Sequence, residues 1–167
     1  MNNRIECAGL QAALRCLTGV RISSTSFLLA RGFPDKAMGT IIGTGIDMIE
    51  VDRIQRALER PLTGARFRAR VFTDTEVAYC ESRGRGRYQS YAARFAAKEA
   101  VMKALGTGWN RNAGWGEIEV VRERGRPPGI KLMGKAERFA QRRQIIAFHV
   151  SITHTATHAI AQVIAES

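Results

Sequence analysis

The chain has 167 residues, enough for one globular domain with a sizeable core, so folding requires neither a disulfide framework nor a structural metal. A hydrophobic fraction of 45% and a charged fraction of 25% exclude wholesale disorder. Lys and Arg outnumber Asp and Glu by 26 to 15, and the resulting net charge of +11 predicts a surface that attracts anions: nucleic acid, acidic lipid, phosphorylated metabolites or an acidic protein.

The three cysteines do not follow the usual metal or disulfide patterns. Cys7, Cys16 and Cys80 are far apart, form no C-x-x-C pair and have no histidine at metal-ligand spacing. We therefore expect free thiols in a reducing compartment. No apolar run approaches the roughly 18 to 20 residues that span a bilayer, so we expect no membrane segment.

Residues 1–37 differ in composition from the rest of the chain. They contain scattered arginines, a cluster of Ser and Thr, and only two acids, Glu6 and Asp35, which is typical of a transit peptide. The alternative is a translation start placed too far upstream, because Met38 is followed at once by a strand pattern. We favour this alternative, and in both cases we expect the folded domain over residues 38–167.

After this extension the pattern predicts a strand and then a helix. TIIGTGIDM reads as a buried strand with two distinct faces, Ile42, Ile46 and Met48 on one and Gly43, Gly45 and Asp47 on the other. The following segment, DRIQRALER, is predicted to be a helix that Asp52 caps and Pro61 ends.

The remaining pattern mixes helices with antiparallel strands. A helix over TDTEVAYCES, opened by Thr73 and Asp74, leads through a solvated SRGRGR loop into a long helix that contains RFAAKEAVMKALGTG. Strands EIEVVRE and IKL flank a GRPPG turn, and a short basic helix, KAERFAQRRQ, precedes a hairpin of AFHVSITH and HAIAQVIA. Helices packed against a mostly antiparallel sheet make an α+β domain.

The long helix carries an acid and a base on one face. Glu99 and Lys103 are four residues apart, and the small side chains of Ala92 and Ala96 leave room above them. Taken alone, such a pair is more often a simple surface ion pair. If the first strand runs beside this helix, however, Asp47 approaches Glu99, and two carboxylates with nearby basic groups form a site for Mg²⁺ and pyrophosphate.

A second stripe on the same helix predicts an anion. Arg94 and Lys98 are also four residues apart, and like charges at this spacing repel each other unless an anion lies between them. The helix then ends in Gly106, Thr107 and Gly108. Glycine is common just past a helix C-terminus, but this sequence also allows backbone N–H groups to approach a phosphate. We predict that these five residues bind phosphate.

The last hairpin presents a polar row. His149, Ser151 and Thr153 share one strand face, which is either plain exposed surface or the lining of a ligand groove. His149, His154 and His158 do not share a face, which excludes a three-histidine metal site. The chain also has no G-x-S-x-G elbow and no complete G-x-G-x-x-G fingerprint, so a serine hydrolase and a dinucleotide site are not indicated.

Three segments, IIGTGIDMIEVDRI, RFAAKEAVMKALGTG and FHVSITHT, closely resemble in this order the signature segments of bacterial holo-acyl-carrier-protein synthases. The similarity runs from Met38 to Glu166 and does not cover residues 1–37. It implies the 4′-phosphopantetheinyl transferase fold and transfer of 4′-phosphopantetheine from coenzyme A to a serine of apo acyl carrier protein. The second product is adenosine 3′,5′-bisphosphate, and the activity serves fatty acid biosynthesis.

The resemblance also implies roles for individual residues. Asp47 and Glu99 correspond to Mg²⁺ ligands, Lys103 lies near the phosphates, and His149 and Ser151 lie close to coenzyme A. Our hypothesis is that Glu99, or a water on the ion beside it, accepts the proton of the substrate serine. The family further implies a homotrimer that holds coenzyme A between neighbouring subunits.

The basic surplus then has a candidate partner, because acyl carrier proteins are small and acidic. We predict a docking surface near Asp47 made of the arginines that follow it, Arg53, Arg56, Arg60 and Arg70, with Arg66 and Arg68 beside them.

The alternative function is a nucleic-acid-binding module without catalysis, suggested by SRGRGR and the net charge, but the aromatic content of 7% provides no stacking platform. The resemblance implies a cytoplasmic enzyme, or an organellar one if residues 1–37 are a transit peptide.

Overall fold

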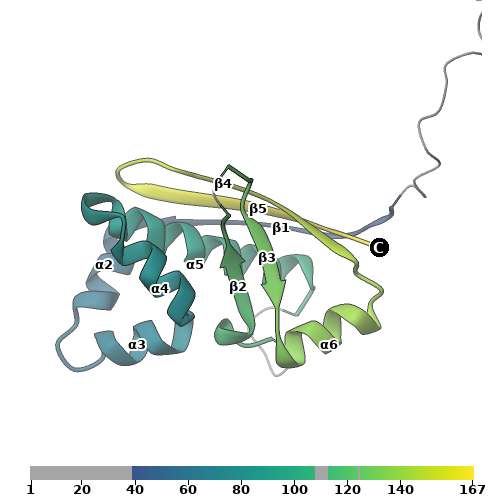
Figure 1. Cartoon of the computed structure of the whole chain (residues 1–167), viewed down its shortest axis with the longest axis horizontal. Coiled ribbons are helices and arrows are strands. Elements are labelled where there is room, and N and C mark those ends of the chain that lie inside the picture. The colour runs from purple at the N-terminus through teal and green to yellow at the C-terminus, as the bar shows by residue number, and fades with distance from the viewer. Residues whose placement is uncertain (1–38, 108–112, 124) are drawn as a thin grey trace, which may run out of the picture. The chain divides into compact units, whose positions relative to one another are not determined.

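The structure, a computed structural model, describes residues 39–107, 113–123 and 125–167. Figure 1 shows its helices and strands, and Gly39–Ser167 form one compact unit. The predictions for residues 1–37, for Cys7 and Cys16 and for Gly108 lie outside the described residues.

A three-stranded antiparallel sheet is the framework of this unit. Its order is β1 (Ile41–Glu50), β5 (His158–Glu166) and β4 (Ala147–His154), so β1 and β4 are its edges. Across the sheet, Asp47 of β1 lies opposite Ala161 of β5, which in turn lies opposite Ile152 of β4. The alternating sequence pattern predicted the β4–β5 hairpin to within one residue.

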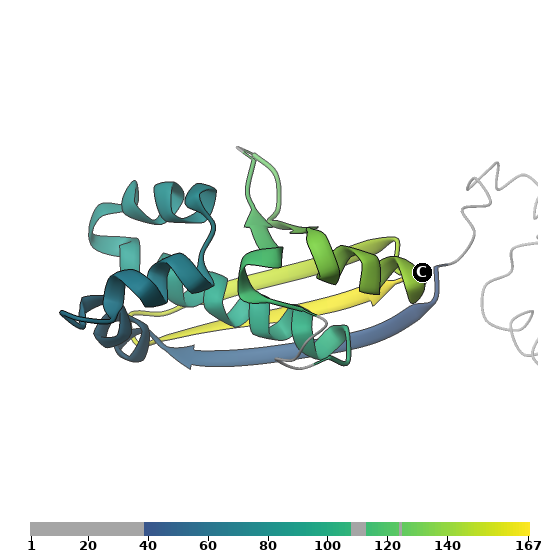
Figure 2. The same ribbon diagram turned by 90° about the horizontal axis from the view of Figure 1, so that it is seen from below.

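The long helix α5 (Arg87–Ala104) packs along one face of this sheet, over β1 and β5 (Figures 1 and 2). The helix and the strand are in very close contact: a Cβ atom added at Gly45 would lie 2.0 Å from the carbonyl oxygen of Ala100. The prediction of a buried strand therefore holds only for the glycine face of β1. On the other face, the side chains of Ile46 and Met48 are each 61% exposed.

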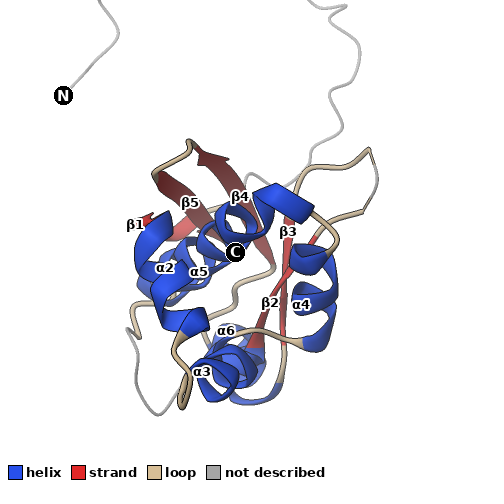
Figure 3. Ribbon diagram, turned by 90° about the vertical axis from the view of Figure 1, so that its left-hand side faces the viewer, coloured by secondary structure: helices blue, strands red, loops and turns tan. Residues whose placement is uncertain are grey.

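The other elements pack against α5 or against one another (Figure 3). In chain order they are α2 (Val51–Glu59), α3 (Gly64–Val71), α4 (Asp74–Glu81), η2 (Gly84–Gly86), η3 (Trp115–Glu117), β2 (Ile118–Val121), β3 (Gly129–Leu132) and α6 (Gly134–Arg142). β2 and β3 form a separate two-stranded antiparallel sheet.

Helix α3 was not predicted, and two further local predictions differ from the structure. Asp52 lies inside the first turn of α2, whose N-cap is Glu50, so Asp52 does not cap the helix. The SRGRGR segment contains the short 3₁₀ helix η2 rather than being entirely loop. Thr73 does open α4, because its side chain and that of Glu76 form a reciprocal capping box.

The core contains a buried ion pair between Lys98 of α5 and Glu76 of α4. Both side chains have no exposed surface, and the Lys98 Nζ atom lies 2.6 Å from Glu76 Oε2. The same ammonium group donates to the carbonyl oxygens of Val71, at 2.6 Å, and Trp115, at 3.0 Å. All three ammonium hydrogens thus have an acceptor. Burial lowers the pKa of Lys98, and the Glu76 carboxylate opposes this shift.

Breaking this pair should destabilise the protein strongly. We expect Glu76→Gln to lower the free energy of unfolding by about 3 to 5 kcal/mol, because the charge of Lys98 is then buried without a counter-charge. Urea unfolding followed by circular dichroism measures this change. Glu123→Gln is the matched control: its ion pair with Arg126 is more than 70% exposed on both sides and should contribute less than about 1 kcal/mol. Equal effects of the two substitutions would contradict the prediction.

Candidate active site

Asp47 from β1 and Glu99 and Lys103 from α5 form a cluster at one flank of the helix. The Lys103 Nζ atom lies 2.9 Å from Asp47 Oδ1 and donates to the carbonyl oxygen of Ile46 at 2.7 Å. Asp47 reaches the helix because Gly45, two residues earlier on the same strand face, lets the two backbones come together. The structure therefore brings together the strand and helix residues that the sequence predicted as partners.

Glu99 carries negative charge that the protein only partly compensates. Burial raises its pKa first, the nearby charge of Asp47 raises it further, and Lys103 acts in the opposite direction. Within the described parts of the chain, Glu99 makes no hydrogen bond and no ion pair. A half-buried carboxylate beside a second carboxylate is a favourable place for a cation.

The donor set at this position fits Mg²⁺. The described residues contain no group of three or more His, Cys, Asp or Glu side chains that could enclose a metal ion. Asp47 and Glu99 would thus supply two carboxylates and leave the other positions to water and to a ligand. Mg²⁺ prefers this arrangement, since it keeps several waters and binds through one or two carboxylates plus substrate phosphates.

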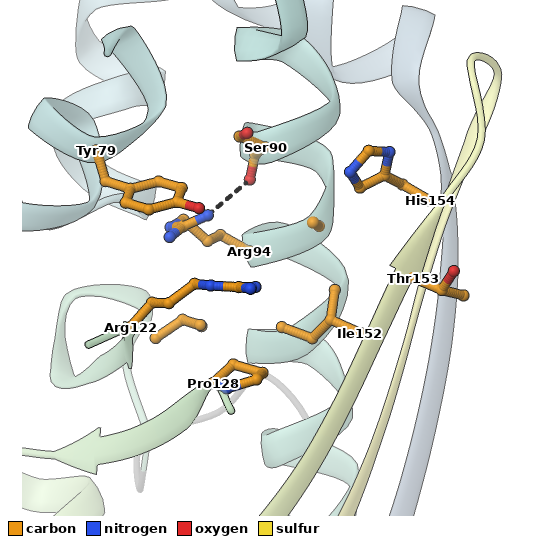
Figure 4. Close-up of a pocket in the computed structure, with 10 residues that line it drawn as sticks. Tyr79, Ser90, Arg94, Arg122, Pro128, Ile152, Thr153 and His154 are labelled. Carbon is orange, nitrogen blue, oxygen red and sulfur yellow. Dashed lines mark hydrogen bonds between the residues drawn. The ribbon is translucent and has the colours of Figure 1, made fainter. Parts of the chain in front are cut away.

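A pocket of about 240 Å³ lies at the other flank of α5 (Figure 4). Arg94, Arg122 and His154 give it a basic wall, and Pro128 and Ile152 give it an apolar wall. A basic and partly apolar pocket suits a ligand that combines phosphate with a flat ring.

Arg94 is held firmly in this pocket. Its guanidinium carbon lies 3.9 Å from the ring centroid of Tyr79, and Nη1 donates to the carbonyl oxygen of Ser90 at 3.3 Å. The residue is only 6% exposed, and its Nε atom has no partner among the described residues. Arg94 thus retains a buried donor for an additional acceptor.

Helix α5 separates the pocket from the acidic cluster. Ser90 in the pocket and Glu99 in the cluster are nine residues apart, and at about 100° per residue they project from opposite sides of the helix. The sheet shows the same division, because Asp47 lies on the edge strand β1 and His154 on the opposite edge strand β4. A single ligand cannot contact both places in one chain without passing around the helix.

The structure corrects part of the predicted phosphate site. Lys98 is buried against Glu76, so the anion that balances its charge is a carboxylate of the protein itself. The N–H groups of Gly106 and Thr107 donate to the carbonyl oxygens of Lys103 and Met102, at 2.9 and 3.1 Å. They therefore close the end of α5 rather than facing a phosphate, and Gly106 is required there by its positive φ of 69°.

His149 and Ser151 project from the sheet face opposite α5, the non-core face on which strand alternation placed them, and His149 pairs there with Glu166. Within one chain they are away from Asp47 and Glu99, and their place beside coenzyme A stays a prediction. The histidine of β4 that lines the pocket is His154, which the sequence reasoning missed as a ligand-binding residue. The signal was present: His154 has the same strand parity as Ile152, which packs against the core.

The predicted docking arginines are all exposed. They lie on α2, on α3 and in the turn between these helices: Arg53, Arg56, Arg60, Arg66, Arg68 and Arg70. Cys80 is a free, buried thiol whose pKa burial raises to about 12, so it is not a nucleophile at neutral pH. Among the described residues, no helix is both long and apolar enough to cross a bilayer.

Comparison with known proteins gives a consistent result. Residues 43–163 match the model of the 4′-phosphopantetheinyl transferase superfamily. The chain is 50% identical over 117 residues to a holo-[acyl-carrier-protein] synthase of Ruminiclostridium cellulolyticum, covering 70% of this chain and 86% of the relative. It is 47% identical over 127 residues to the synthase of Solibacter usitatus, covering 76% of this chain and 99% of the relative.

A solved structure agrees with these relatives. The Helicobacter pylori holo-[acyl-carrier-protein] synthase, in complex with coenzyme A, superposes with a TM-score of 0.64 at 28% identity, covering 73% of this chain and 98% of that one. Both the sequence and the fold therefore place this protein in one family: the chain belongs to the holo-[acyl-carrier-protein] synthases of the 4′-phosphopantetheinyl transferase superfamily.

Proposed function

We propose that this protein transfers 4′-phosphopantetheine from coenzyme A to a serine of apo acyl carrier protein, and that it does so in fatty acid biosynthesis. The serine Oγ atom forms a bond to the phosphorus that carries pantetheine, the pyrophosphate P–O bond breaks, and adenosine 3′,5′-bisphosphate leaves. The observation that carries the proposal is the pair of carboxylates, Asp47 and Glu99, with Lys103 between α5 and β1.

The chain's own residues have distinct roles in this reaction. Asp47 and Glu99 hold Mg²⁺, which when bound neutralises the charge of the pyrophosphate oxygens. Lys103 adds a positive charge at the same place. Glu99, or a water on the ion beside it, accepts the proton of the serine hydroxyl.

We further propose that the enzyme works as a homotrimer. The pocket with Arg94, Arg122 and His154 holds the nucleotide end of coenzyme A, and the acidic cluster of a neighbouring subunit holds the pyrophosphate. The separation of these two places by α5 in one chain supports a shared site. The sheet face that exposes Ile46 and Met48 supports association, because exposed apolar surface favours burial between subunits.

The arginines of α2 and α3 form the proposed docking surface for the acidic carrier protein. Arg53 lies in the first turn of α2, which directly follows the strand that carries Asp47, so a carrier bound there presents its serine near the acidic cluster. The alternative of a nucleic-acid-binding module is not supported, because the matching relatives are synthases and a phosphate-driven binder has no use for two adjacent carboxylates.

The function is tested by intact-protein mass spectrometry of apo acyl carrier protein incubated with this protein, coenzyme A and Mg²⁺. We expect a mass gain of one phosphopantetheine group that EDTA abolishes, and that Glu99→Gln abolishes even at saturating Mg²⁺. Near-normal turnover of Glu99→Gln would refute the assigned role of Glu99. No gain with the wild type, for several carriers, would refute the proposed function.

The thermal stability of Glu99→Gln tests the raised pKa of Glu99 and shows that the variant is folded. The pKa of Glu99 is higher in the folded than in the unfolded state, so its ionised form lowers stability as the pH rises through the raised value. Without metal, Glu99→Gln should therefore unfold at a slightly higher temperature than the wild type at neutral pH. The difference should vanish below about pH 4, where Glu99 is protonated in both states.

Carrier docking predicts a selective kinetic defect. Arg53→Glu should raise the KM for the carrier protein about tenfold, equivalent to about 1.4 kcal/mol, and leave the KM for coenzyme A nearly unchanged. Arg138→Glu on α6, also exposed, is the matched control for the change in net charge. An equal rise of both KM values for Arg53→Glu would count against a dedicated docking surface.

The shared site predicts complementation between two inactive variants. Glu99→Gln has an intact pocket, and the double variant Arg122→Glu/His154→Ala has intact carboxylates. Trimers co-refolded from equal amounts should recover roughly a quarter of wild-type activity, because one site in four combines the two intact halves. Absence of any recovery in correctly assembled mixed trimers would show that each site belongs to a single chain.

A further inference from the structure

We propose that Lys98 and Glu76 form a positioning pair that fixes the rotation and axial position of α5, and thereby the placement of Glu99 against Asp47. The inference rests on the proposed function and adds to it two residues that touch neither substrate nor metal.

The interface between α5 and β1 is too smooth to fix the helix by itself. The helix presents small side chains to the sheet, all of them buried: Ala92, Ala96, Ala97, Ala100 and Ala104. The residues of β1 that face them are Gly43 and Gly45. This contact brings the two backbones close, and the half-exposed Lys103 side chain crosses it with hydrogen bonds to Ile46 and Asp47. The contact lacks the interlocking buried side chains that normally resist sliding and rotation of a helix.

Lys98, the residue before Glu99, fixes the rotation of α5. Lys98 directly precedes Glu99, and its ammonium group is bound to the end of α3 at Val71, to η3 at Trp115 and to Glu76 of α4. Three hydrogen bonds to three separate elements define the position of one atom. Because Lys98 and Glu99 are adjacent on a rigid helix, this also fixes the direction of Glu99.

Glu76 is held as firmly as its partner. Its Oε2 atom accepts the N–H of Thr73 at 2.9 Å, and its Oε1 atom accepts the N–H of Val120 of β2 at 2.9 Å. The carboxylate is thus attached to the start of α4 and to the second sheet, so the anchor for α5 does not move with α5.

The energetics favour a positioning role over a stabilising one. A buried ion pair is often no more stabilising than apolar residues of similar size, because both charges lose their hydration. The side chains of a catalytic site, by contrast, need to be held within about 0.5 Å of the productive geometry. A helix that slips by one residue moves Glu99 by about 1.5 Å, which exceeds this tolerance.

The test removes both charges together, so that neither remains buried alone. In Glu76→Gln/Lys98→Met we expect a folded protein whose affinity for Mn²⁺, titrated by electron paramagnetic resonance as a probe of the metal site, falls about tenfold or more. We expect kcat to fall by a similar factor, with the KM for the carrier protein unchanged. The same chemical changes at exposed positions, Glu137→Gln/Lys131→Met, should alter none of these quantities.

Each outcome decides between the possibilities. A folded double variant with wild-type Mn²⁺ affinity and kcat overturns the inference and leaves the pair a purely structural feature. If the double variant does not fold, Glu76→Asp replaces it: this variant keeps both charges but shortens the anchor, and wild-type Mn²⁺ affinity in it overturns the inference as well. Failure of the wild type to bind Mn²⁺, with Asp47→Asn as reference, would instead refute the proposed metal site.

Discussion

The contact between the glycine face of β1 and the alanine face of α5 is the constraint on which the rest of the molecule depends. With no side chain at Gly45, the carbonyl oxygen of Ala100 lies only 2.0 Å from the position that a Cβ atom would take. A strand and a helix at this distance place Asp47 beside Glu99 and Lys103, although they are about 50 residues apart in the chain. The same contact leaves Ile46 and Met48 on the outer face of the sheet, so the approach that builds the acidic cluster also creates the surface proposed for association.

The two lysines of helix α5, Lys98 and Lys103, lie in opposite environments. Lys98 enters the core, where it is stable only because a carboxylate and two carbonyl groups accept its hydrogens. Lys103 stays half-exposed at the edge of β1, where its charge offsets Asp47 and remains accessible to a phosphate. One helix thus carries a buried ion pair and part of the acidic cluster, and another flank forms the wall of the pocket that contains Arg94.

Local chemistry made much of this predictable from the sequence. Strand alternation identified the β4–β5 hairpin, and the spacing of Glu99 and Lys103 placed both on one flank of α5, where Asp47 joins them. What failed required knowledge of tertiary contacts. Nothing near Lys98 in the sequence reveals Glu76, 22 residues earlier, so two like charges suggested an external anion. The sequence GTG is compatible with both a helix C-terminus and a phosphate-binding loop. Only the observed hydrogen bonds show that the N–H groups of Gly106 and Thr107 bind carbonyl oxygens at the end of α5. His154 was missed because its face of β4 consists otherwise of apolar side chains, such as Ile152, whereas the polar row that includes His149 points outward.

The acidic cluster shows why such a site needs a rigid support. Burial and the charge of Asp47 both disfavour the ionised form of Glu99, so the folded chain alone holds these carboxylates in an unfavourable arrangement. Repulsion between them would be relieved by a small movement of α5 away from β1. The alanine–glycine contact resists that movement little, and the hydrogen bonds of Lys103 to Ile46 and Asp47 come from a long, half-exposed side chain that can follow it. Resistance to this movement therefore has to come from elsewhere in the core. The only fully buried charged pair among the described residues is formed by Glu76 and Lys98, and Lys98 is the residue next to Glu99. The repulsion between Asp47 and Glu99 makes the cluster suitable for a cation, and the buried Lys98–Glu76 pair prevents α5 from moving to relieve that repulsion.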